Sequence, residues 1–225
     1  MKFKAMLKVA AAGLAAAMCV SASGNWNTKV AEVDGGHRIG NPQAKVRLTE
    51  YVSYTCPHCA HFARDGDAAL QFSYVGSGRV QLEVRHFVRD VVDLTAAMLT
   101  NCGAPAKFPR NHAAFMLGQE KWLPKAASAT QAQQQRWFTG APAARHRAIA
   151  SDLGFYEIMS SRGYTRTQVD ACLADSAMSQ RLVDNTVKDA KALDIKGTPS
   201  FAINGVLLDG VHDWQSLQPR LDAKF

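Results

Sequence analysis

The chain has 225 residues, of which 47% are hydrophobic and 20% charged, and its formal charge at neutral pH is +7. This composition is typical of a globular protein with a substantial core and argues against a disordered chain. The sequence has no apolar run of the roughly 18 residues that a membrane span needs, and its five cysteines are too few for a disulfide scaffold.

Residues 1–22 have the pattern of a secretory signal peptide. Three lysines precede a short apolar stretch over residues 9–20, and small residues end it at Ala22. A cytosolic helix and, because of Cys19, a lipidated N-terminus are the alternatives. Cleavage would remove those three lysines and lower the charge from +7 to +4, which is too mild to indicate a nucleic-acid partner. It would also leave four cysteines in an oxidising compartment, where disulfides persist.

The first half of the remaining chain predicts a strand, a helix and a second strand. Residues 23–35 are polar and are expected to be a flexible lead-in. Val46 to Val52 is a β-rich run, and the cysteine motif follows it directly. A helix is expected from Pro57 to about Tyr74, weakened at Gly66, and residues 80–88 alternate as a strand does.

The second half predicts a helical insertion followed by a hairpin. Residues 93–193 are rich in Ala, Gln and Arg, and prolines at 105, 109, 124 and 142 break them into several helices. Ser200–Ile203 and Val206–Leu208 flank Asn204-Gly205, a strong hairpin signal, and a last helix is expected from Asp213 to Leu221. The expected units are therefore a βαβ half (36–92), helices with a return helix (93–193) and a ββα half (194–225).

The motif Cys56-Pro57-His58-Cys59 carries the candidate chemistry. At the start of a helix, the sulfur of Cys56 would lie near unpaired backbone N–H groups and the positive end of the helix dipole, which stabilise a thiolate. Pro57 suits the first helical position, and His58 adds a donor near the sulfur. We expect an exposed Cys56 and a less exposed Cys59 that acts as the resolving thiol.

These residues predict thiol–disulfide exchange without a metal or an organic cofactor. A substrate thiolate would attack Cys56 of the Cys56–Cys59 disulfide, and a second substrate thiol would resolve the mixed disulfide. The alternatives are a zinc half-site and two unrelated cysteines. A structural zinc site wants a second Cys/His pair, whereas Cys102 and Cys172 are isolated in the sequence.

The sequence resembles the DsbA-like branch of the thioredoxin superfamily. The resemblance lies in the run from Glu50 to Cys59, with its CPHC motif, and in Gly197-Thr198-Pro199-Ser200-Phe201 near the end of the chain. It implies an α/β thioredoxin fold, a central mixed sheet flanked by helices, with an inserted α-helical subdomain.

Three more site residues follow from the resemblance. Pro199 matches the family's cis-proline, Thr198 would pair its backbone with the substrate chain, and Glu50 matches a buried acid that moves a proton for Cys59. The alternatives are a plain turn proline and an exposed glutamate at a strand edge. The DsbA oxidases usually carry a valine where this chain has Thr198, which resembles the disulfide isomerases instead.

The resemblance also implies a structural disulfide, a location and partners. Cys102 and Cys172 would pair and staple the helical subdomain, or else remain two buried thiols. The implied protein is periplasmic, oxidises exported proteins that have free cysteines, and is reoxidised by a DsbB-like, quinone-linked membrane partner. The alternatives are an isomerase or reductase that uses the same site, and a non-catalytic peptide- or metal-binding protein.

Overall fold

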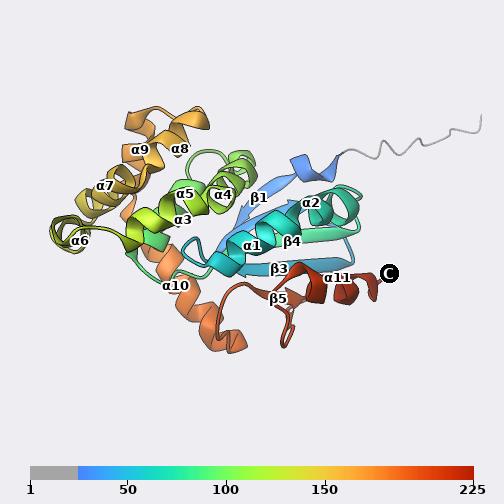
Figure 1. The fold of residues 1–225 in the computed structure, drawn as a ribbon. Helices are drawn as coiled ribbons and strands as arrows, with labels where there is room; N and C mark the ends of the chain where they lie inside the picture. The colour runs from blue at the N-terminus through green and yellow to red at the C-terminus, as the bar shows by residue number, and fades with distance from the viewer. Residues whose placement is uncertain (1–24) are drawn as a thin grey trace, which may run out of the picture.

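A computed structural model describes residues 25–225, which contain a mixed sheet of six strands (Figure 1). The strand order is β1-β2-β4-β3-β5-β6. β3 and β4 are parallel, whereas β2 with β4 and β3 with β5 are antiparallel. The strands are β1 (Val30–Val33), β2 (Gly36–Gly40), β3 (Val46–Val52), β4 (Val80–His86), β5 (Ser200–Ile203) and β6 (Val206–Leu207).

Helices follow β3 directly, and others form a separate group between β4 and β5, which is the fold class expected from the sequence (Figure 1). A single helical turn, η1 (Trp26–Thr28), precedes the sheet. After β3 come α1 (Pro57–Asp65), α2 (Asp67–Ala69) and a π-helical stretch, η2 (Leu70–Val75). The inserted group comprises α3 (Val91–Thr100), η3 (Pro105–Lys107), α4 (Phe108–Leu117), α5 (Gln119–Ala127), α6 (Gln131–Phe138), α7 (Pro142–Leu153), α8 (Phe155–Ser161) and α9 (Arg166–Leu173). The long α10 (Ser176–Leu193) returns to the sheet, and α11 (Trp214–Asp222) ends the fold.

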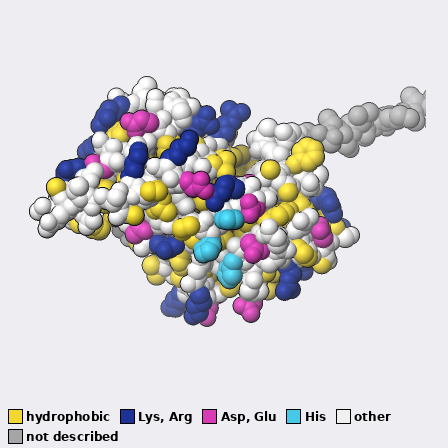
Figure 2. Space-filling view, in the orientation of Figure 1, with side chains coloured by type: hydrophobic (Ala, Val, Ile, Leu, Met, Phe, Trp, Pro, Cys, Tyr) yellow, Lys and Arg dark blue, Asp and Glu magenta, His cyan; other side chains and the backbone are white. Residues whose placement is uncertain are grey.

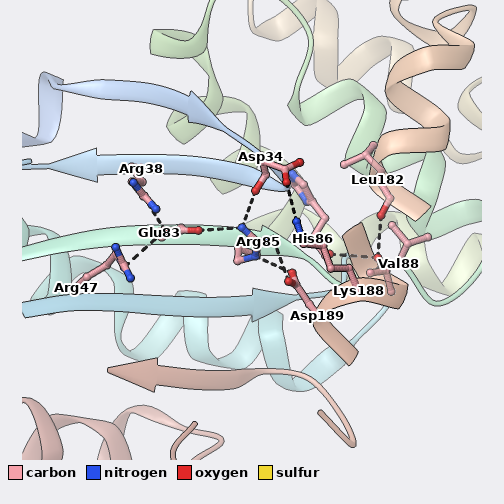
Figure 3. Close-up of polar contacts among 11 residues, drawn as sticks. Asp34, Arg38, Arg47, Glu83, Arg85, His86, Val88, Leu182, Lys188 and Asp189 are labelled. Atoms are coloured by element: carbon pink, nitrogen blue, oxygen red, sulfur yellow. Dashed lines mark hydrogen bonds and ion pairs between the residues drawn. The ribbon is translucent and has the colours of Figure 1, made fainter. Parts of the chain in front are cut away.

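The two faces of the sheet differ in chemistry. One face carries apolar residues of β3 and β4 that pack under α1 and α11 in the main core. The other carries a charge network in which Arg85 holds Asp189 of α10 with two hydrogen bonds, of 2.6 and 3.0 Å, and also binds Glu83 (Figure 3). Glu83 in turn accepts a 2.7 Å bond from Arg38. The network fixes α10 against the sheet, and the chain that leaves α10 leads to β5.

The prediction of a flexible lead-in over residues 23–35 is wrong for the part that the structure describes. β1 pairs with β2 through the register Val30↔Ile39 to Val33↔Gly36, and Asp34-Gly35 forms the turn between them. Gly35 has φ of +90°, a conformation that glycine adopts without strain. An Asp-Gly pair between short β-prone runs is a hairpin signal, so the sequence did contain it.

One helix prediction is confirmed and another needs correction. The stretch expected as a helix over residues 57–74 is helical as α1, α2 and η2, with an interruption at Gly66, where a Cβ would come within 3.0 Å of the Trp214 ring. The Trp214 ring of α11 thus occupies the space that a side chain at residue 66 would need. Pro124 lies inside α5 and breaks nothing, whereas Pro105 and Pro142 do stand in the first turn of their helices.

The hairpin prediction is confirmed, with Asn204 and Gly205 both at positive φ between β5 and β6. The predicted signal peptide, 1–22, lies outside the described residues. Within residues 25–225, none of the helices combines the length and the apolar character that crossing a membrane requires.

Candidate active site

The CPHC motif lies where β3 passes into α1. Cys56 is the N-cap of α1, in an extended conformation, and Pro57 is its first residue. The side chain of Cys59 faces the core, one turn into the helix. Both cysteines are free thiols in this structure. The residue order and the preset φ of proline thus place the first sulfur at the positive end of the helix.

The expectation of an exposed Cys56 is wrong, because this residue is only 2% exposed and Cys59 is 1% exposed. The Cys56 thiol donates a 3.0 Å hydrogen bond to the carbonyl oxygen of Thr198, across the site. The loop that contains Thr198 therefore covers the sulfur.

The surroundings separate the acidities of the two thiols. A hydrogen bond from Cys59 is the largest cause that lowers the pKa of Cys56 from 9.0 to about 5; the Thr198 hydroxyl and the backbone N–H groups of Cys59 and His58 add to it. In the thiol form, the Thr198 hydroxyl is buried without a partner, so it is available to donate to a thiolate. Burial, and then Cys56, raise the pKa of Cys59 well above 9.0.

The Thr198–Pro199 peptide bond is cis, as the resemblance implies. The Pro199 carbonyl oxygen lies 2.8 Å from Nδ1 of His212, and the Ser200 hydroxyl donates to the Gly197 carbonyl at 2.8 Å. These contacts hold the loop that contacts Cys56 at the start of β5. Residues separated by about 140 positions in the sequence thus meet at one sulfur.

Two residues of the helical insertion hold the segment before α1, and no pattern in the sequence predicts either of them. The side-chain amide of Gln119 donates to the carbonyls of Tyr54 and Cys56 at 2.7 and 2.9 Å. The buried carboxylate of Asp93 accepts bonds from the Ser53 hydroxyl at 2.6 Å and from the Tyr54 amide at 2.7 Å. Burial raises the pKa of Asp93 to about 7. The helical insertion thus shapes the active site.

The other predicted site residues lie at three different places. Glu50 of β3 is 3% exposed and faces the core, and burial raises its pKa well above the ordinary value. His58 is exposed, and no hydrogen bond joins its imidazole to Cys56; its backbone amide is what assists the sulfur. Cys102 and Cys172 form a disulfide within the helical insertion, with their Cα atoms 5.7 Å apart.

The surface over the site is histidine-rich. Figure 2 shows histidine side chains gathered near the beginning of α1, and His58, His61 and His212 are all exposed. His61 pairs with Asp65 at 3.4 Å, one helical turn further on. Across the described part of the chain, no cluster of three or more His, Cys, Asp or Glu residues is arranged to hold a metal ion.

Comparison with known proteins identifies the family. A family model described as "Thioredoxin" matches residues 32–223. The chain belongs to the thioredoxin family. A Rickettsia typhi protein named "Putative protein-disulfide oxidoreductase" is 31% identical over 169 residues, or 75% of this chain. The same match covers 54% of the Rickettsia protein, so the chain spans about half the length of the curated relatives it matches.

Solved structures share the whole thioredoxin-like fold. A crystal structure of a protein-disulfide isomerase from Novosphingobium aromaticivorans is 47% identical, with a TM-score of 0.82, and the match covers 86% of this chain and 98% of that one. α-DsbA1 of Wolbachia pipientis is 20% identical with a TM-score of 0.68, covering 85% and 92% of the two chains. A DsbA protein of Wolbachia pipientis thus has the same overall fold.

Proposed function

We propose that this protein is an exported thiol–disulfide oxidoreductase that donates its Cys56–Cys59 disulfide to cysteines of other exported proteins. The observation that carries the proposal is the unequal pair of thiols beside a cis-proline. Cys56 is stabilised as a thiolate, while Cys59 is buried and held as a thiol. Such a pair favours the reduced protein and therefore gives its disulfide away.

The reaction follows from these positions. A substrate thiolate attacks the Cys56 sulfur, the Cys56–Cys59 bond breaks, and Cys59 leaves with the bonding electrons and takes up a proton. A second substrate thiolate then attacks the substrate sulfur of the mixed disulfide and releases Cys56 as a thiolate. The substrate loses two electrons and the protein gains them. Thr198 and Pro199 present backbone to the substrate chain, and Glu50 supplies the proton to Cys59.

The lowered pKa of Cys56 sets an upper limit on how far the dithiol form is stabilised. A pKa of about 5 in place of 9.0 stabilises the dithiol form at pH 7 by at most about 3 kcal/mol before solvent screening. For a two-electron couple this raises the reduction potential by about 60 mV. The shift is large enough to move a reductant toward the oxidants of the family.

We place the protein in the periplasm because residues 1–22 have the pattern of a signal peptide. In this compartment the substrates would be folding proteins with free cysteines. Reoxidation would require a DsbB-like, quinone-linked membrane partner, as the resemblance implies. No step of the reaction calls for a metal or an organic cofactor.

The deciding experiment equilibrates the Cys56–Cys59 pair against glutathione buffers of known ratio and quantifies the reduced fraction. We expect a potential clearly above that of thioredoxin, toward the roughly −120 mV of a strong oxidant. A potential near about −270 mV would instead identify a reductant and reject the oxidase role.

A disulfide isomerase or reductase is the second candidate. It is favoured by Thr198, where the oxidases usually carry valine, and by the solved structure at 47% identity, which is described as a protein-disulfide isomerase. Comparing two rates separates the candidates: oxidation of a reduced dithiol peptide, and repair of a protein with scrambled disulfides. An oxidase is faster in the first assay, and an isomerase is faster in the second.

A further inference from the structure

An acidic residue lies on the face of α1 and α2 that packs on the sheet. The buried residues of α1 toward the sheet include Cys59, Phe62 and Ala63, at helical spacing. Gly66 keeps a right-handed helical conformation, so α2 continues in nearly the same direction. Asp67, four residues after Ala63, therefore continues this stripe. Apart from Asp67, the stripe consists of apolar, small and thiol side chains.

A second acid, which is buried, lies on the strand below. Glu50 shares the core face of β3 with Leu48 and Val52, and its neighbours in register, Val84 and Phe201, are apolar. Because β3 runs toward Cys56 and α1 runs back over the same face, Glu50 lies below the stretch between Cys59 and Asp67. Neither the Glu50 nor the Asp67 carboxyl has a hydrogen bond or an ion pair with another described residue.

The electrostatics agree with this arrangement. After burial, the charge of Asp67 is the cause that raises the pKa of Glu50, and burial raises the pKa of Asp67 to about 7. The charge of Glu50 in turn contributes to the raised pKa of Cys59 and of Tyr54. Cys59, Tyr54 and Asp67 are thus the titratable groups that interact with Glu50, and Asp67 is the one that is partly exposed.

The proposed reaction requires a proton donor for Cys59 that can itself be reprotonated. When Cys59 leaves as a buried thiolate it takes up a proton, and a protonated Glu50 can supply it. The carboxylate that remains is buried, and it must recover a proton before the next cycle. Two neighbouring carboxyls resist being ionised together, so a proton on one is available to the other.

We propose that Glu50 and Asp67 form a two-carboxyl proton relay between Cys59 and water, with Asp67 as the positioning residue on the solvent side. The inference rests on the proposed function, since it assigns the proton path of that reaction. Glu50 transfers its proton to the Cys59 sulfur, Asp67 transfers one to Glu50, and water reprotonates Asp67. The net change is one proton moved from water to Cys59.

The first test follows the Glu50 carboxyl by carbon-13 NMR in the reduced full-length protein over a pH series. In Asp67→Asn, the like charge is gone, so Glu50 is expected to ionise at a pH about one unit lower. The matched control is Asp65→Asn, which removes an exposed acid two residues away and is expected to leave Glu50 unchanged. An unchanged Glu50 titration in Asp67→Asn, or an equal shift in Asp65→Asn, overturns the relay.

The second test measures the rate at which dithiothreitol reduces the Cys56–Cys59 disulfide, corrected for the thiolate fraction of the reagent. Asp67→Asn is expected to slow this step at pH 8 about tenfold, while Asp65→Asn changes it less than twofold. Asp67→Glu keeps the carboxyl and should retain the wild-type pH profile. A uniform slowing at every pH, or no rescue by glutamate, assigns Asp67 a purely structural role.

A failure of the relay can be distinguished from a failure of the proposed function. The NMR titration needs no turnover, so it tests the pair of carboxyls even if the protein proves to be a poor oxidase. Reciprocal coupling gives a check in another variant: Glu50→Gln should lower the pH at which Asp67 ionises. If the wild-type protein oxidises dithiothreitol rapidly and this coupling is absent, the relay alone is rejected.

Discussion

The two cysteine pairs of this protein lie at opposite ends of helices. Cys56 is the N-cap of α1, where backbone N–H groups and the positive end of the dipole favour a thiolate. Cys102 lies two residues beyond the end of α3, and Cys172 is in the last turn of α9. Helix C-termini present carbonyl oxygens and disfavour an anion. We therefore expect the Cys56–Cys59 disulfide to be easier to reduce than the Cys102–Cys172 disulfide.

The largest expected effect separates the pairs by activity. Cys56→Ser removes the attacked sulfur, so single-turnover oxidation of a dithiol peptide should fall by at least about a thousandfold, to the background rate. The comparison variant, with Cys102→Ala and Cys172→Ala together, should retain the oxidation rate within about twofold. The comparison fails if the double variant loses oxidation or if Cys56→Ser retains it. Peptide binding that persists in an inactive Cys56→Ser protein would be compatible with our mechanism.

The second largest effect is expected on the free energy of unfolding, when the Cys102–Cys172 disulfide is removed. The Cys102–Cys172 bond closes a loop of 70 residues, so its loss should lower the free energy of unfolding by up to about 4 kcal/mol. Denaturant unfolding of the double alanine variant measures this loss. The pKa of Cys56 should not change, because the disulfide is no part of its surroundings. A change in that pKa would show that the helical insertion transmits strain to the active site.

The sequence predicted the reactive pair better than its surroundings. The cysteines, Pro57 and the hairpin after Pro199 are local patterns with local physical causes, and they lie where they were expected. Gln119 and Asp93 hold the segment before Cys56 from 63 and 39 residues away. A lone glutamine or aspartate in a helical stretch carries no signal of such a contact. The burial of Cys56 was missed for the same reason, since a loop far along the chain covers it.

Low pH is expected to destabilise the contact between the thioredoxin-like sheet and the helical insertion, because buried histidines lie where the two meet. His37 of β2 stacks on Phe108 of α4, with ring centroids 3.9 Å apart, and its Nδ1 has no partner. Burial lowers the pKa of His37 from 6.5 to about 4, so below pH 6.5 the unfolded chain binds the extra proton. Stability from this group is therefore full above pH 6.5 and is lost as the pH falls toward 4.

His37→Phe tests this contribution while keeping a ring against Phe108. The difference in unfolding free energy between variant and wild type should move by about 3 kcal/mol in favour of the variant between pH 7 and pH 4. The raised pKa values of Glu50, Asp67 and Asp93 act in the opposite sense. The quantity to measure is therefore the difference between the two curves of unfolding free energy against pH, one for the variant and one for the wild type. Parallel curves would exclude His37 as a source of acid sensitivity.

The smallest expected effect is on the pKa of Cys56, when one hydrogen-bond donor beside its sulfur is removed. Thr198→Val removes the hydroxyl that can donate to the Cys56 thiolate and leaves the Thr198 carbonyl in place. The pKa of Cys56 should rise by up to about one unit, because the hydrogen bond from Cys59 and the helix N–H groups remain. Thiolate absorbance against pH measures the shift, and Thr198→Ser, which restores the hydroxyl, is the matched control. If valine and serine give the same pKa, the acidity of Cys56 comes from the helix start and Cys59 alone, and the contrast between the two ends of helices becomes stronger.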